Sequence, residues 1–141
     1  MITLEVRKTI RATPQQLFDA WTQPSILRRW WGPKGMTCIA AQIDLRIGGG
    51  YRIANRFEDG RVIWIAGEFE QIDPPSLLVY TWRVDTQTTP ERVTVRFERR
   101  GGATDVIVRH ERIAEEAARE QHERGWHDCL DGLEALMTDP T

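Results

Sequence analysis

Apolar and polar residues alternate over much of the chain, and this two-residue period predicts β-strands. Residues 3–10 show the alternation first, and six more such segments follow between residues 37 and 113. Short turn sequences separate these segments, among them Asp59-Gly60 and residues 73–76. Because short connections join neighbouring antiparallel strands, we predict one antiparallel sheet of about seven strands.

Two short helices and one long helix are predicted from apolar residues three and four positions apart. The first covers residues 14–23 and begins with a Thr-x-x-Gln capping box. The second covers residues 24–31, and the long one covers residues 114–137. Gly125 and Gly132 lie inside the long helix. Each costs about 1 kcal/mol relative to alanine, so we expect another backbone to approach closely there, or space to be left.

The order of these elements is a strand, two short helices, six strands and a long helix, which predicts an α+β fold. We expect the antiparallel sheet to curve around the C-terminal helix in a single domain that covers residues 1–141. A curved sheet and a helix often leave space between them, so a pocket is expected there.

The composition argues against several classes of partner. A net charge of -2 does not provide the basic face that nucleic-acid binding requires. No apolar run reaches the roughly 20 residues of a membrane span, and the N-terminus lacks the apolar core of a signal peptide. The two cysteines, Cys38 and Cys129, do not make a secreted disulfide framework. We therefore expect reduced thiols and a cytoplasmic location.

Two of the six tryptophans are adjacent, in the sequence RRWWGP. Gly32 and Pro33 end the second short helix, and Trp30 belongs to its apolar stripe. Consecutive helical residues lie about 100° apart, so Trp31 is expected to point elsewhere, near the rim of the pocket. We predict that Trp30 anchors the helix and that Trp31 gates the pocket.

Five segments of the chain carry a family resemblance: TPQQLFDAWTQPSILRRWWGP, DLRIGGGYRI, GEFEQIDPPSLLVYTW, ATDVIVRHE and HERGWHDCLDGLEALM. Together they resemble the activator of heat-shock ATPase homologue-like family, which belongs to the START-like helix-grip superfamily, also called SRPBCC or Bet v 1-like. The resemblance covers residues 4–137. It implies a helix-grip fold with a cavity between the sheet and the long helix.

The resemblance also implies two kinds of partner. Members of the superfamily bind lipids, hormones and polyketides, and some are enzymes, so an apolar small molecule is one expected partner. A heat-shock chaperone is the other. The founding eukaryotic activators contact that chaperone through an additional N-terminal domain as well. Since 141 residues leave no room for such a domain, the chaperone role is the weaker expectation.

Strand alternation and helix spacing together assign side chains to the wall of the expected pocket. The wall should be apolar and aromatic with a few polar groups, which is typical of ligand sites and also of protein cores. Glu68 is an additional polar candidate that could equally face solvent. Arg46 and Arg52 could attract a carboxylate at the pocket mouth, although two simply exposed arginines are the commoner case. The candidate ligand-binding residues are Trp31, Met36, Tyr51, Asn55, Tyr80, Trp82, Phe97, His110, His122, Trp126 and Cys129.

His110 and His122 are the candidate catalytic pair, because histidine titrates near neutral pH and both are expected to face inward. The alternative is a structural role as hydrogen-bonded, partly buried side chains. His122 and Cys129 share one helix face, but two ligands fall short of a zinc set. We expect no metal and no cofactor.

These observations favour a protein that takes an apolar or aromatic small molecule into the cavity. Two alternatives stay open. One is an enzyme of the cyclase or hydratase type in which His110 and His122 move protons. The other is a modulator of a heat-shock chaperone ATPase. The oligomeric state also stays open, a homodimer included.

Overall fold

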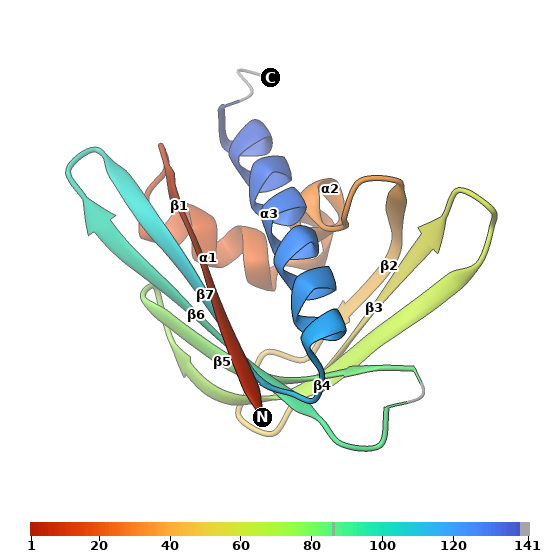
Figure 1. The fold of residues 1–141 in the computed structure, drawn as a ribbon. Helices are drawn as coiled ribbons and strands as arrows, with labels where there is room; N and C mark the ends of the chain where they lie inside the picture. The colour runs from red at the N-terminus through yellow and green to blue at the C-terminus, as the bar shows by residue number, and fades with distance from the viewer. Residues whose placement is uncertain (86, 139–141) are drawn as a thin grey trace.

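The computed structural model describes residues 1–85 and 87–138, and within them seven strands form one antiparallel sheet. The strand order is β1-β7-β6-β5-β4-β3-β2, so β2 to β7 pair in succession and β1 joins the far edge beside β7. This arrangement confirms the predicted α+β fold (Figure 1). The strands are β1 (Ile2–Ile10), β2 (Met36–Ile43), β3 (Gly50–Phe57), β4 (Val62–Asp73), β5 (Leu77–Val84), β6 (Glu91–Arg100) and β7 (Ala103–Ile113).

Two short helices follow β1, as predicted, and their ends have local causes. Helix α1 (Pro14–Thr22) begins with the expected capping box, in which the backbone N–H of Gln16 donates to Thr13 Oγ1 at 3.1 Å. Helix α2 (Pro24–Trp30) ends one residue earlier than predicted, because Trp31 has an extended backbone with a ψ of 139°. Trp31 therefore leaves the helix, and the angular argument used to place it does not apply.

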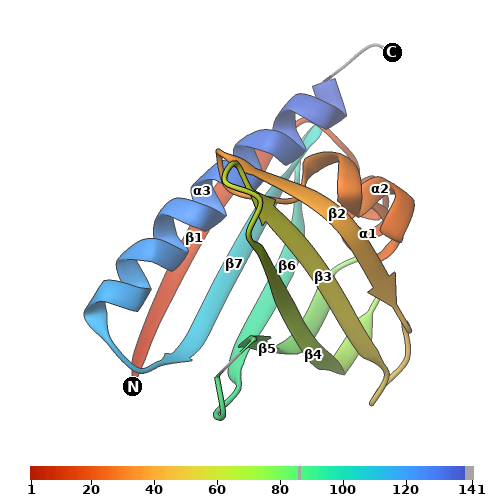
Figure 2. The same cartoon turned by 90° about the vertical axis from the view of Figure 1, so that its right-hand side faces the viewer.

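The long helix α3 (Glu116–Thr138) crosses the concave side of the sheet along β1 and β7 (Figures 1 and 2). Helices α1 and α2 lie beside its C-terminal half. A Cβ on Gly132 would lie 2.8 Å from the carbonyl oxygen of Trp30, which confirms the predicted close approach of another backbone. Among the described residues, no helix combines the length and apolar character that crossing a membrane requires.

The sheet is irregular where β4 pairs with β5, with a register shift between Phe69 and Gln71. Gly67 permits a close approach nearby, because a Cβ there would lie only 2.0 Å from the carbonyl oxygen of Thr81. Tyr51 of β3 reaches the same carbonyl oxygen, to which its hydroxyl donates at 2.6 Å. Its ring also packs on Tyr80, with centroids 5.2 Å apart. These contacts bring aromatic rings of β3 and β5 together inside the sheet.

Candidate functional site

A cavity of about 490 Å³ lies between strands β2 to β5 and the N-terminal half of α3. This volume is within the range of small-molecule sites. The strands contribute residues that alternation placed on the inner face, and α3 contributes one side of its helix. Of the candidate ligand-binding residues, seven line this cavity: Trp31, Met36, Asn55, Trp82, His122, Trp126 and Cys129.

A second, much smaller void of about 20 Å³ lies deeper inside the sheet. Tyr51 and Tyr80 line this void and not the larger cavity. Its volume is enough for about one water molecule, so it does not hold an organic ligand as it stands. Trp31 and Trp82 line both spaces, which makes them the partition between the two. Phe97 lines neither, because it packs in the core against Trp21 at a centroid distance of 5.8 Å.

Trp31 is only 6% exposed, so it does not stand at the rim as predicted. Its ring centroid lies 5.5 Å from that of Trp30 and 6.0 Å from that of Trp82. The prediction was wrong in position because Trp31 is not part of α2. The two neighbours still differ in one respect: Trp30 Nε1 donates to the carbonyl oxygen of Ala20 at 3.0 Å, as expected of an anchor.

Three buried polar atoms on residues that line the large cavity have no hydrogen-bond partner within the described part of the chain. They are Trp31 Nε1, Trp82 Nε1 and Asn55 Oδ1. Leaving a buried polar atom unpaired costs about 1–3 kcal/mol. Other tryptophans avoid this cost; for example, Trp126 Nε1 donates to His110 Nδ1 at 3.0 Å. These atoms have almost no accessible surface, so a ligand with complementary polar groups pairs with them only after the side chains shift toward the cavity.

A buried carboxylate lies behind this wall, at the first residue of β6. Glu91 is 3% exposed, and His110 Nε2 and His122 Nε2 approach its Oε1 atom at 2.6 and 3.1 Å. Gln87 Nε2 donates to the other carboxylate oxygen at 3.1 Å. Burial by itself raises the pKa of Glu91, but these hydrogen bonds outweigh it and lower the pKa to about 2. Glu91 is therefore ionised at neutral pH.

The hydrogen bonds of His110 fix its protonation. An indole N–H can only donate, so the contact from Trp126 requires a lone pair on His110 Nδ1. We therefore assign a neutral ring with its proton on Nε2, directed at Glu91. Burial is also the main cause that lowers the pKa of His110. His110 is 0% exposed and does not line the cavity. The predicted inward orientation is confirmed, but His110 contacts Glu91 and does not line the cavity.

Glu91, His110 and His122 bring three metal-type ligand atoms within 4.8 Å of one another. Two histidines and one carboxylate form a known set for iron. A ligating histidine, however, uses a nitrogen lone pair for the metal and donates from its other nitrogen. His110 has the opposite arrangement, because Trp126 donates to Nδ1 and the proton is on Nε2. The hydrogen bonds of this group therefore favour a carboxylate held by two histidines and oppose metal binding.

Cys129 lines the cavity, but its thiol is not activated. Burial raises the pKa of Cys129 to about 12. A nucleophilic cysteine needs a lowered pKa, so this side chain behaves as a small apolar group.

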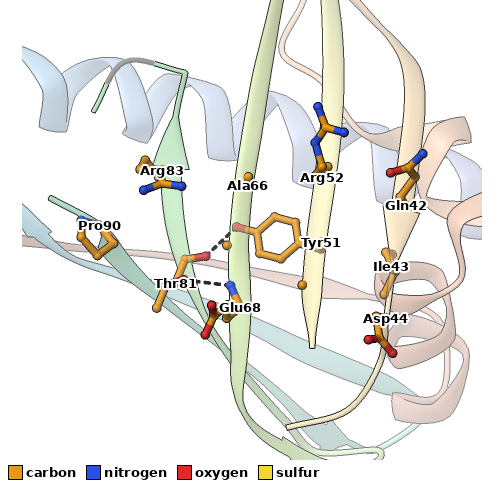
Figure 3. Close-up of a pocket in the computed structure, with 12 residues that line it drawn as sticks. Gln42, Ile43, Asp44, Tyr51, Arg52, Ala66, Glu68, Thr81, Arg83 and Pro90 are labelled. Carbon is orange, nitrogen blue, oxygen red and sulfur yellow. Dashed lines mark hydrogen bonds between the residues drawn. The ribbon is translucent and has the colours of Figure 1, made fainter. Parts of the chain in front are cut away.

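Another hollow, of about 720 Å³, lies on the opposite side of the sheet from α3 (Figure 3). Glu68, Arg52 and Thr81 line it, and Figure 3 shows the Thr81 hydroxyl accepting from the Glu68 backbone N–H at 2.9 Å. Arg52 stacks on Trp64 at 4.2 Å, and Arg46 pairs with a neighbouring carboxylate, Asp44 Oδ2, at 2.8 Å. Glu68, Arg46 and Arg52 are exposed and lie outside the inner cavity.

Comparison with known proteins identifies the family of this chain. The family described as activator of Hsp90 ATPase homolog 1-like protein matches residues 11–138. The chain belongs to this family. No curated protein matches it.

Solved structures of other proteins show the same fold. A protein from Chromobacterium violaceum is 24% identical, with a TM-score of 0.89 and 99% of both chains covered. The AHSA1 protein from Silicibacter pomeroyi is also 24% identical, with a TM-score of 0.86 and 96% of both chains covered. CalU16 from Micromonospora echinospora is 21% identical, with a TM-score of 0.74, 96% of this chain covered and 76% of its own. At these identities the likeness establishes the helix-grip fold alone.

Sequence reasoning missed Glu91, although a signal was present. Glu91 has the same strand parity as Val93, Val95 and Phe97, all of which are buried. A carboxylate at an inward position of a buried strand predicts a partner, because a buried charge without one is costly. Histidine was the available partner type, and His110 on the neighbouring strand shares the inward parity.

Proposed function

We propose that this protein is a cytoplasmic binding protein that takes an aromatic small molecule with a polar head group into the cavity between β2–β5 and α3. The observation that carries the proposal is the presence of three unpaired buried polar atoms on residues of one cavity wall. Trp31 and Trp82 supply indole N–H donors, and Asn55 supplies an amide oxygen. The volume of about 490 Å³ suits a small aromatic molecule.

The wall chemistry supports an aromatic ligand. Trp31, Trp82 and Trp126 all line the cavity, and the Trp82 and Trp126 ring centroids are 5.6 Å apart. Rings at such distances offer edges and faces on which another ring can stack, which contributes about 0.5–1.5 kcal/mol per aromatic pair. Two buried cysteines without a disulfide are consistent with a reducing compartment.

A matched pair of probes tests the proposal. Naphthalene and 2-acetylnaphthalene share an aromatic body, but only the second has a carbonyl acceptor. We expect both to quench tryptophan emission on binding and the acetyl compound to bind more tightly, because it pairs an indole N–H. Calorimetric titration gives the two dissociation constants.

The Trp82→Phe substitution keeps an aromatic ring and removes the N–H donor. A hydrogen bond contributes about 0.5–1.5 kcal/mol, so the acetyl compound should lose up to about tenfold in affinity while naphthalene is unchanged. Trp64→Phe is the matched control, since Trp64 lies outside the cavity and stacks on Arg52. Failure of both probes to bind would contradict the proposed function.

A further inference from the structure

The one histidine that lines the cavity, His122, is oriented by the buried carboxylate of Glu91. His122 Nε2 lies 3.1 Å from Glu91 Oε1, so a neutral ring that directs its proton at the carboxylate has its lone pair on Nδ1. Within the described part of the chain, Nδ1 has no hydrogen-bond partner, and the side chain is 18% exposed. His122 also lines the cavity, so a molecule bound there contacts its ring.

Groups from three neighbouring strands surround His122. Glu91 on β6 is ionised, and the His110 ring on β7 stacks on His122 with centroids 4.2 Å apart. His110 is held neutral, so it adds no positive charge that would oppose an imidazolium. Trp82 on β5 packs edge-to-face on His122 at 5.9 Å, and Gln87 caps the second oxygen of Glu91. A protonated His122 would thus lie against a buried carboxylate, and opposite charges at this distance stabilise each other.

We propose that Glu91 and His122 form a dyad that accepts the proton of a phenolic ligand bound in the cavity. The inference rests on the proposed function and names the ligand class. In the step, the O–H bond of the phenol breaks and an N–H bond forms at His122 Nδ1, while the phenolate oxygen keeps the electron pair. His122 contacts the ligand, and Glu91 acts through it as a positioning residue.

The chemistry selects a phenol over other hydroxyl compounds. A phenol has an ordinary pKa of about 10, and a cation within about 4–6 Å lowers the pKa of an acid by about one to three units. Aliphatic alcohols are far weaker acids, and proton transfer from them to an imidazole is too unfavourable. The aromatic body matches the tryptophan wall, and Trp82, which packs against His122, has an indole N–H without a partner in the described part of the chain.

The experiment uses 4-nitrophenol, because its phenol and phenolate forms have distinct visible absorption bands. Spectral titration over pH in the presence of saturating protein gives the pKa of the bound probe. We expect this pKa to fall by about one to three units relative to the free probe. The His122→Gln substitution should abolish the fall. The His127→Gln substitution is the matched control and should retain it, since His127 is exposed on the same helix and does not line the cavity.

A second measurement on the unmodified protein is independent of how the variants fold. Nitrogen NMR of the histidine rings should show His122 Nδ1 becoming protonated when 4-nitrophenol binds, and 4-nitroanisole, which lacks the hydroxyl, should leave it unprotonated. Three results would overturn the dyad proposal. 4-Nitrophenol could fail to bind, it could bind with an unshifted pKa, or the shift could persist in His122→Gln. In each of these cases the proposed binding function still stands if the naphthalene probes bind. If the naphthalene probes also fail to bind, the binding function and the dyad are both contradicted.

Discussion

Replacing Glu91 by glutamine keeps the shape of the side chain and removes the negative charge that three donors hold. In Glu91→Gln, the amide oxygen can still accept from one histidine. The amide nitrogen, however, is a donor and would face either Gln87 Nε2 or the histidine N–H groups that now surround the carboxylate. The substitution therefore leaves buried donors opposed to one another, in a position that is 3% exposed.

The expected loss in the free energy of unfolding follows from the lowered pKa of Glu91. Hydrogen bonds overcome the effect of burial and lower the pKa of Glu91 from the ordinary 4.5 to about 2. Each pKa unit corresponds to about 1.4 kcal/mol of interaction between the protein and the ionised form. We therefore expect Glu91→Gln to lower the free energy of unfolding at neutral pH by about 3 kcal/mol.

The pH dependence has a definite sign. The folded-state pKa lies below the unfolded one, so the stabilisation is fully present above pH 4.5 and is lost as the pH falls toward 2. The wild type should therefore approach the variant in stability over this window. His110 also has a lowered pKa, because of burial, and makes both proteins sensitive to acid below its ordinary value of 6.5. The difference between wild type and variant therefore reports Glu91 together with its coupling to His110, and the part lost between pH 4.5 and 2 is that of the carboxylate itself.

Urea unfolding monitored by tryptophan emission, repeated over this pH range, measures both effects. Glu70→Gln is the matched control, because Glu70 is partly exposed and pairs with Arg92 at 2.8 Å. A surface pair of this kind contributes about 0–1 kcal/mol. The reasoning is refuted if Glu91→Gln is no less stable than Glu70→Gln at neutral pH. It is equally refuted if the gap to wild type stays constant as the pH falls from 4.5 toward 2.

Three further outcomes are expected. Gly67→Ala should destabilise the protein by about 3 kcal/mol, because its Cβ would lie 2.0 Å from a carbonyl oxygen. Gly102→Ala is the control and should change stability by less than about 0.5 kcal/mol, because no atom lies within 4 Å of its Cβ. Urea unfolding measures the free energy of unfolding of both variants. Cys129 should resist iodoacetamide until the protein is unfolded, as mass spectrometry can follow, because burial raises its pKa to about 12. Thr13→Ala removes the cap of α1 and should lower the free energy of unfolding by about 1 kcal/mol in the same assay, so an unchanged value would speak against the capping box.

The element order and the inward faces could be read from the sequence because both depend on short-range periodicity. A strand repeats every two residues and a helix every 3.6, so local pattern fixes which side chains share a face. Asn55, Tyr80 and His110 were correctly placed inward on this basis, and all three are buried. The capping box of α1 was equally local, since it involves residues only three positions apart.

The functional grouping depended on distances that no local pattern contains. Glu91, His110 and His122 come from two strands and a helix, and sheet curvature together with the path of α3 brings their side chains into contact. The protonation of His110 was decided by a donor on α3, Trp126. Trp31 lies between the two internal spaces because the backbone adopts an extended conformation at this residue, directly after α2.

The sequence by itself thus determined the fold class and the apolar character of the inner face, through the backbone geometry of a few neighbouring residues. Only the tertiary structure decided which polar groups meet there. It placed one carboxylate between two histidines, and it left Trp31 Nε1, Trp82 Nε1 and Asn55 Oδ1 without partners among residues 1–85 and 87–138. The physical reason is that hydrogen bonds act over about 3 Å, so sub-ångström differences in curvature and register decide whether a distant side chain becomes a partner.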